Sequence, residues 1–121
     1  MRRHAHTRKD PRKAKEIQLH RFTIDLLRFC RCKDVVYFHV PNGEARSAAT
    51  GAKLKTMGVL PGVFDITLIL LGNQLRFLEL KTPKGSLSID QMAFGELLDA
   101  VGTPWAVASS PEQVTSILAQ W

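Results

Sequence analysis

The sequence lacks the features that would place a protein in a membrane or outside the cell. It has no run of about 18 apolar residues, and its longest apolar stretch, Ile66–Leu71, contains Thr67 and is only as long as a strand. No apolar segment follows the charged N-terminus, which argues against a secretory signal. The chain has two cysteines, Cys30 and Cys32, too few for a domain held together by disulfides. We therefore expect a cytoplasmic protein that does not enter the membrane.

Ligands for a structural zinc ion are also lacking. The two cysteines are separated by a single residue, and the four histidines do not follow the spacing of a zinc finger. We interpret Cys30 and Cys32 as ordinary thiols. Two of the histidines, His20 and His39, are interpreted as a helix residue and a strand residue rather than as general bases.

Acidic residues are scarce at the start of the chain. The 121 residues, the length of one domain, carry 17 Lys and Arg against 11 Asp and Glu, a net charge of +6. Residues 1–15 hold seven basic residues and one acid, so this segment accounts for the whole excess. We predict a flexible basic arm over 1–14 and a folded domain over 15–121. The arm is either a solvated tail or a segment that contacts nucleic-acid phosphates, and its candidate contacts are Arg8, Lys9, Arg12 and Lys13.

Periodicity predicts four helices and four strands in the order α-β-α-β-β-α-β-α. Leu19, Phe22, Leu26 and Phe29 recur at helical spacing and predict a helix over 15–31. Alternation and turn residues predict strands at 35–40, 64–71, 74–81 and 104–108, and weaker signals predict a helix at 44–57. Ser88 and Ser110 each begin a further helix, the second with proline at its first position. The predicted fold class is α/β, a mixed sheet flanked by helices on both faces.

Charged residues at the end of strand 74–81 are the main sign of chemistry. Because side chains alternate along a strand, Glu79 and Lys81 share one face. Asp65 lies on the preceding strand, immediately before its apolar run, and it shares that face only if residue 65 pairs with residue 79. A two-residue loop at Gly72-Asn73 would pair 65 with 80. We therefore predict an odd-numbered loop or a bulge between these strands.

These residues belong to a longer pattern. His39-Val40-Pro41-Asn42-Gly43, then Gly58-x-x-x-Gly62-x-x-Asp65, Glu79-x-Lys81 and Ser88-x-x-Gln91 resemble the VRR-NUC family, of the stand-alone phage or bacterial type. That family belongs to the PD-(D/E)xK nuclease superfamily, which has the restriction-endonuclease-like fold. The resemblance covers about residues 15–120. Phe64 stands where the family usually has proline, a residue that restrains the backbone but does no acid–base work.

The resemblance implies a metal-dependent DNA endonuclease. Asp65, Glu79 and the backbone carbonyl of Leu80 would bind Mg²⁺ or Mn²⁺, and Lys81 would orient water or stabilise charge on the phosphate. Glu16 matches an acidic residue that the family places near the site, but a first-turn glutamate is also favoured by the helix dipole. Stand-alone members resemble dimeric enzymes that resolve DNA junctions. The resemblance thus implies a homodimer acting on branched or flapped DNA.

Gln91 has two interpretations. As the third residue of its helix it could form a capping box with Ser88, a purely structural role. It also lies on the same helical stripe as Phe94 and Leu98, which points its amide toward the sheet and the site. Gly95 on the same side would allow that helix to approach the sheet closely. We favour the role at the site.

Further candidates for contacts with nucleic acid are Asn42, Lys53, Lys55 and Lys84. Two other classes of function compete with the endonuclease. One is a non-catalytic protein that binds structured DNA and retains the nuclease fold, which would not need Asp65, Glu79 and Lys81 together. The other is a protein-interaction module with a basic tail, which would show no salt-sensitive binding to DNA.

Overall fold

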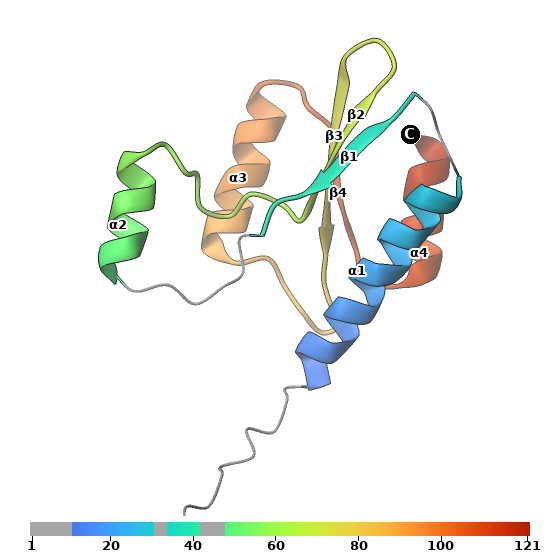
Figure 1. Cartoon of the computed structure of the whole chain (residues 1–121), viewed down its shortest axis with the longest axis horizontal. Coiled ribbons are helices and arrows are strands. Elements are labelled where there is room, and N and C mark those ends of the chain that lie inside the picture. The colour runs from blue at the N-terminus through green and yellow to red at the C-terminus, as the bar shows by residue number, and fades with distance from the viewer. Residues whose placement is uncertain (1–10, 31–33, 42–47) are drawn as a thin grey trace, which may run out of the picture.

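The computed structural model describes residues 11–30, 34–41 and 48–121. Its elements follow the predicted order α-β-α-β-β-α-β-α (Figure 1). They are α1 (Pro11–Phe29), β1 (Val36–His39), α2 (Ala48–Thr56), β2 (Ile66–Leu70), β3 (Gln74–Leu80), α3 (Ile89–Ala100), β4 (Trp105–Ala108) and α4 (Pro111–Gln120). None of the described helices is long and apolar enough to cross a membrane.

The four strands form one mixed sheet in the order β1-β2-β3-β4. β2 pairs antiparallel with β1 and with β3, whereas β3 pairs parallel with β4. Because β3 and β4 are parallel, a crossover is required between them, and α3 provides it. The predicted mixed α/β sheet is confirmed.

The turn between β2 and β3 sets the register that the site needs. Leu70 pairs with Gln74, which leaves a three-residue loop, as the sequence predicts. Gly72 and Asn73 adopt φ values of 81° and 62°, a left-handed conformation that these two residue types tolerate best. Ile66 consequently pairs with Leu78, and the next position places Asp65 opposite Glu79 on the same face of the sheet.

The two faces of the sheet carry separate apolar clusters. On one face, Ile66, Leu68, Leu78 and Leu80 pack against α1 and α4, with Leu19 and Val114 as buried helix residues. On the other face, Phe77 and Trp105 pack against Phe64 and against Phe94 and Leu98 of α3. An added Cβ at Gly95 would lie 2.8 Å from the Trp105 ring, which confirms the predicted close approach of α3. Helices thus cover both faces (Figure 1).

Helix α1 differs from its prediction in two respects. It begins at Pro11 rather than near residue 15, so residues 11–14, which the prediction gave to the arm, are helical. Arg12 therefore lies exposed in the first turn, and Lys13 is also helical. The predicted apolar stripe is also wrong in part, because Phe29 is 86% exposed and Phe22 is 37% exposed. The buried side of α1 contains Leu19 and Thr23. The Thr23 hydroxyl donates a hydrogen bond to the Leu19 carbonyl, so this polar group is satisfied within the helix.

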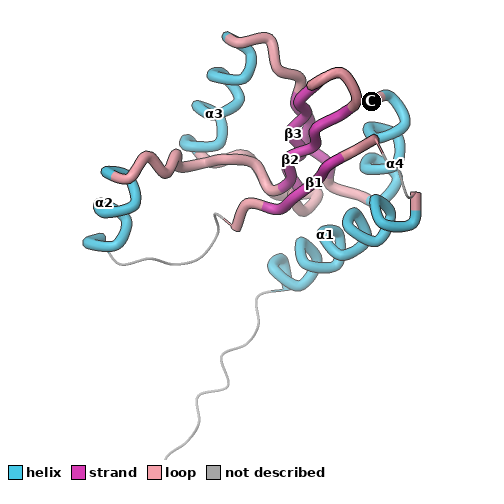
Figure 2. The backbone as a smooth tube through the Cα atoms, turned by 45° about the horizontal axis from the view of Figure 1, so that its top comes forward, coloured by secondary structure: helices cyan, strands magenta, loops and turns pink. Residues whose placement is uncertain are grey.

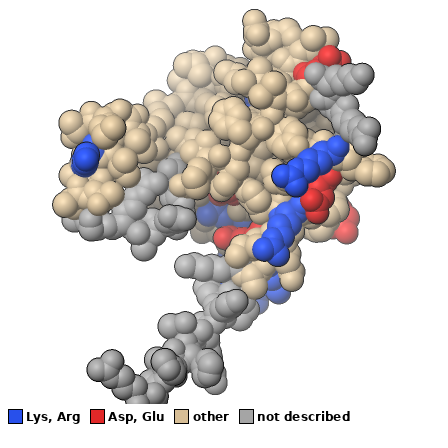
Figure 3. Space-filling view, in the orientation of Figure 1, with Lys and Arg blue, Asp and Glu red and all other residues tan. Residues whose placement is uncertain are grey.

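Both predicted helix starts after the hairpin are confirmed. Ser88 caps α3 and forms a capping box with Gln91, and Ser110 caps α4 ahead of Pro111. By contrast, α2 stands apart from the sheet (Figure 2), and most of its side chains are exposed. On the face drawn in Figure 3, Lys and Arg side chains lie mainly along α1, with another on α2.

Candidate active site

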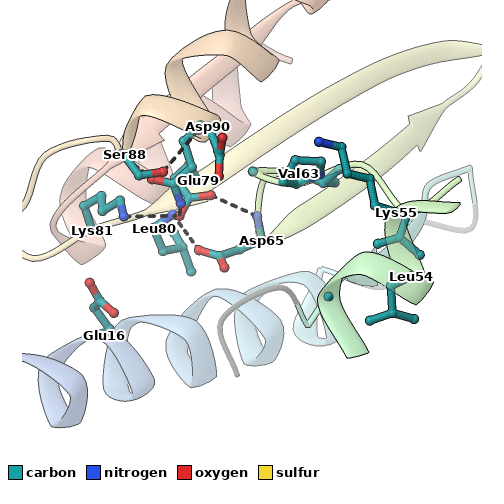
Figure 4. A pocket seen from close by; sticks show the side chains of 15 residues that line it. Glu16, Leu54, Lys55, Val63, Asp65, Glu79, Leu80, Lys81, Ser88 and Asp90 are labelled. Carbon is teal, nitrogen blue, oxygen red and sulfur yellow. Dashed lines mark hydrogen bonds and ion pairs between the residues drawn. The ribbon is translucent and has the colours of Figure 1, made fainter. Parts of the chain in front are cut away.

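Asp65, Glu79 and Lys81 meet at one end of the sheet, where β2 begins and β3 ends (Figure 4), and Gln91 of α3 joins them there. They line a crevice of about 410 Å³ together with Glu16, Leu80 and Lys55. Glu79 is 3% exposed, whereas Asp65 and Lys81 are partly open to the crevice. The three side chains that the sequence analysis placed on one face are therefore neighbours.

Glu79 is held by three groups. Its Oε2 accepts a hydrogen bond from the Asp65 backbone N–H at 3.1 Å, and its Oε1 accepts one from Gln91 Nε2 at 3.1 Å. The Lys81 ammonium lies 3.9 Å from Oε1. Burial and the negative charge of Asp65 together raise the pKa of Glu79 to about 8, although the positive charge of Lys81 opposes this rise. The two carboxylates therefore repel each other more strongly than Lys81 compensates.

Asp65 is fixed through its backbone as well as its side chain. Its Oδ2 accepts from the Leu80 N–H at 3.0 Å. Its carbonyl accepts from the Val40 N–H at 2.9 Å and from His39 Nδ1 at 2.8 Å, and Nδ1 must be the donor because a carbonyl cannot donate. Asp65 is thereby held beside Glu79, with its side chain partly open to the crevice.

His39 is a strand residue, as predicted, but its contact with Asp65 was not predicted, because only the pairing of β1 with β2 brings the two residues together. The edge of one histidine ring packs against the face of another, His20 of α1, with centroids 4.4 Å apart. Burial lowers the pKa of His20, as does His39, and the negative charge of Asp65 opposes them. The available signal was the position of His39 directly before Val40-Pro41 in the pattern that the sequence analysis quoted.

Gln91 combines the two roles that the sequence analysis treated as alternatives. Its Oε1 accepts from the Ser88 N–H at 2.9 Å and its own N–H donates to Ser88 Oγ at 3.1 Å, which completes the capping box. Its Nε2 is then left to bind Glu79. The cap therefore orients the amide toward the carboxylate.

Gly62 allows α3 to bring Gln91 this close. It has a φ of 78°, and a Cβ there would lie 2.3 Å from the Asp90 carbonyl carbon and 2.7 Å from the Gln91 nitrogen. No side chain fits at that distance, so residue 62 must be glycine for the loop before Asp65 to pack on the start of α3. The second glycine of the Gly58-x-x-x-Gly62-x-x-Asp65 pattern thus has a steric reason.

The remaining predicted residues are more dispersed. Glu16 projects from α1 into the crevice, opposite Lys81 and Asp65 (Figure 4). Lys55 of α2 lines the crevice as well, whereas Lys53 and Lys84 are exposed and lie outside it. Arg12 is exposed at the start of α1. Arg8, Lys9 and Asn42 lie outside the described residues, and so does the side chain of Lys13.

The donor set fits a hard divalent cation. Asp65 and Glu79 offer carboxylate oxygens on one face, and burial and the charge of Asp65 raise the pKa of Glu79, which makes its ionised form costly without a nearby cation. No cluster of three or more His, Cys, Asp or Glu side chains suited to a metal ion occurs within 11–30, 34–41 and 48–121. Mg²⁺ is commonly held by one or two carboxylates, with waters and substrate phosphates completing its shell, so two carboxylates suffice.

Comparison with known proteins supports the fold. No protein-family model matches the sequence, and no curated protein matches it either. A solved structure described as "VRR_NUC domain" superposes with a TM-score of 0.61 at 19% sequence identity. The match covers 88% of this chain and 97% of that one. The chain therefore has the fold of a VRR_NUC domain, which is the restriction-endonuclease-like fold that the sequence predicts.

Proposed function

We propose that this protein is a VRR-NUC nuclease that hydrolyses DNA phosphodiester bonds with Mg²⁺ or Mn²⁺. The observation that carries the proposal is the crevice in which Asp65 and Glu79 lie on one face beside Lys81 and Gln91. Two adjacent carboxylates, one of them buried, destabilise each other unless a cation or a proton lies between them. A lysine at the same point suits an anionic substrate.

Asp65, Glu79 and the Leu80 carbonyl would hold the metal ion. When bound, the ion supplies Lewis-acid activation of water and neutralises charge at the phosphate. Lys81 places a positive charge where the phosphate gains negative charge in the transition state. Gln91 keeps Glu79 oriented, and Glu16 adds a third carboxylate at the mouth of the crevice.

Branched DNA, such as Holliday junctions or flaps, is the proposed substrate, and a homodimer is the proposed assembly. Both follow from the likeness to stand-alone VRR-NUC enzymes, and two symmetric cuts in a junction need two sites. Lys55 lines the crevice and supports contact with the backbone there, and Arg8, Lys9, Arg12, Lys13, Asn42, Lys53 and Lys84 are proposed as more distant contacts. An intracellular location suits a DNA substrate.

Incubation of the protein with four-way junctions and flaps in Mg²⁺, in Mn²⁺ and in EDTA tests this proposal. We expect cleavage with either metal and none in EDTA. Asp65→Asn should lower the cleavage rate at least about 1,000-fold, because the amide keeps the hydrogen bond from Leu80 but loses the charge. Asp90→Asn is the matched control, since Asp90 is an exposed acid lining the same crevice.

If the wild-type protein binds junctions but never cuts them, the result would contradict the nuclease proposal and favour a non-catalytic DNA-binding protein. Normal cutting by Asp65→Asn would show that the reaction takes place elsewhere. Protein that neither binds nor cuts DNA would leave the interaction module as the better interpretation.

A further inference from the structure

A second crevice, of about 250 Å³, lies beside the first. Its walls are the first residues after β3 (Lys81, Thr82 and Pro83), the first residues after β4 (Ser109, Ser110 and Pro111) and the start of α1 with Lys15. Lys81 lines both crevices. We refer to the first, with Asp65 and Glu79, as the acidic crevice and to the second as the basic crevice.

The topology of the sheet creates the basic crevice. β3 and β4 are adjacent and parallel, but the chain leaves β3 toward α3 on one face and leaves β4 toward α4 on the other. The two connections therefore diverge and leave a gap at the carboxyl ends of the strands. In open α/β sheets, ligands bind in the gap at such a switch point.

The groups that line the basic crevice are donors and cations. Lys15 and Lys81 contribute ammonium groups, and none of the nine lining residues is acidic. Glu112, in the first turn of α4, is exposed and does not line the crevice. No described carboxylate lies within ion-pairing distance of Lys15. An anion is therefore the ligand that this lining favours, and a metal cation is excluded.

Hydroxyl groups point to the same class of ligand. Thr82, which is 7% exposed, and Ser110 both line the basic crevice. A threonine or serine hydroxyl can donate a hydrogen bond to a ligand oxygen. Ser110 Oγ accepts the Gln113 N–H at the α4 cap, which leaves its own proton free to donate. The helix start beside it is also favourable to negative charge.

We propose that the basic crevice binds a backbone phosphate of the nucleic-acid strand, adjacent to the phosphate held at Asp65 and Glu79. This inference rests on the proposed nuclease function and specifies how its substrate is placed. Lys81 stands between the two crevices, 3.9 Å from Glu79 on one side and lining the basic crevice on the other. A strand that crosses Lys81 would present successive phosphates to the two crevices. Phosphate contacts of this kind position a substrate without reading its sequence.

The test measures the affinity of the full-length protein for a fluorescein-labelled flap duplex in EDTA, where no metal is present to support cleavage. Lys15→Ala and the near-isosteric Thr82→Val should each weaken binding about three- to tenfold, the net effect of one lost hydrogen bond of typical strength. Arg28→Ala is the matched control, because Arg28 is an exposed cation at the opposite end of α1. It should change the affinity less than about twofold. Thermal unfolding checks that each variant is folded. If Thr82→Val does not fold, Lys15→Ala still tests the proposal, because Lys15 is exposed.

A methylphosphonate scan then identifies the phosphate. Each substituted duplex lacks the charge of one phosphate, and one position next to the cut should weaken binding by the wild type but not by Lys15→Ala. The proposal would be overturned if the wild type and Lys15→Ala lost the same affinity at every substituted position. It would also be overturned if Lys15→Ala and Thr82→Val both bound the flap duplex as tightly as the wild type. Inorganic phosphate that shifts the Thr82 and Ser110 amide resonances, with no effect of the variants on DNA binding, would assign the crevice to free phosphate and overturn it as well. If affinity falls at one phosphate position but the protein never cleaves DNA, the result would support phosphate binding in the basic crevice and contradict the proposed nuclease function.

Discussion

The two crevices that meet at Lys81 have opposite charge. The acidic crevice contains Glu16, Asp65, Glu79 and Asp90 with Lys55 and Lys81, whereas the basic crevice has Lys15 and Lys81 and no acid. On α1 the change of sign falls between adjacent residues, because Lys15 lines one crevice and Glu16 the other. Carboxylates that face each other favour a cation, and ammonium groups beside free hydroxyls favour an anion. One strand of nucleic acid, with its bound cation, could use both.

The two crevices also differ in how their polar side chains are held. Hydrogen bonds with Leu80, Val40 and His39 hold Asp65 in place, and one from Gln91 holds Glu79. In the basic crevice, Ser110 Oγ accepts the hydrogen bond at the helix cap and keeps its own proton for a ligand. A preorganised centre suits chemistry, whereas unsatisfied donors suit binding.

Lys81→Met gives the largest expected effect and tests whether the crevices act together. Methionine retains the length of the side chain but removes the charge, so cleavage should fall about 100- to 1,000-fold through lost stabilisation of the transition state. Affinity for the flap duplex in EDTA should also fall about tenfold. Rate assays and fluorescence anisotropy measure the two effects. In contrast, Asp65→Asn should lower only the rate and Lys15→Ala only the affinity. If Lys81→Met binds DNA as the wild type does, Lys81 serves the acidic crevice alone.

Gln91→Glu gives the next largest effect and separates catalysis from capping. Glutamate retains the oxygen that accepts from Ser88 but loses the amide donor to Glu79, so α3 should stay capped while cleavage falls about 10- to 100-fold. Ser88→Ala is the control for the cap and should cost about 1 kcal/mol of stability with cleavage nearly unchanged. Cleavage kinetics and urea unfolding distinguish the variants. Equal losses of cleavage in both would show that Gln91 acts only through the helix.

The pH dependence of stability gives the smallest effect and tests the strain in the acidic crevice. The pKa of Glu79 is raised to about 8 in the folded protein, above its ordinary value of 4.5. The folded state therefore binds a proton that the unfolded state has lost, and this contribution to stability is full below about pH 4.5 and lost as the pH rises through 8. The free energy of unfolding in EDTA should fall between pH 5 and pH 8. In Glu79→Gln this fall should be smaller, and identical slopes would contradict the raised pKa.

Most of the fold and part of the site could be predicted from the sequence because their determinants are local. Alternation on β3 placed Glu79 and Lys81 on one face, and the odd-numbered loop at Gly72 and Asn73 set Asp65 opposite Glu79. The capping signals at Ser88 and Ser110 fixed two helix starts. Each depends on residues a few positions apart, whose preferences act before the chain is folded.

Long-range packing decided the rest. The apolar stripe of α1 was mispredicted at Phe22 and Phe29, because the face that a helix buries depends on where it meets the sheet. His39 reaches the Asp65 carbonyl only through the pairing of β1 with β2. The basic crevice joins residues 15, 81–83 and 109–111, which have no pattern in common along the chain.

The sequence by itself thus determined the order of the elements, the register of the hairpin and the pair of carboxylates. Only the tertiary structure decided which loops meet beside Lys81. The physical reason is that β3 and β4 run parallel while their connections leave toward opposite faces, and a gap between diverging connections exists only once the sheet has formed.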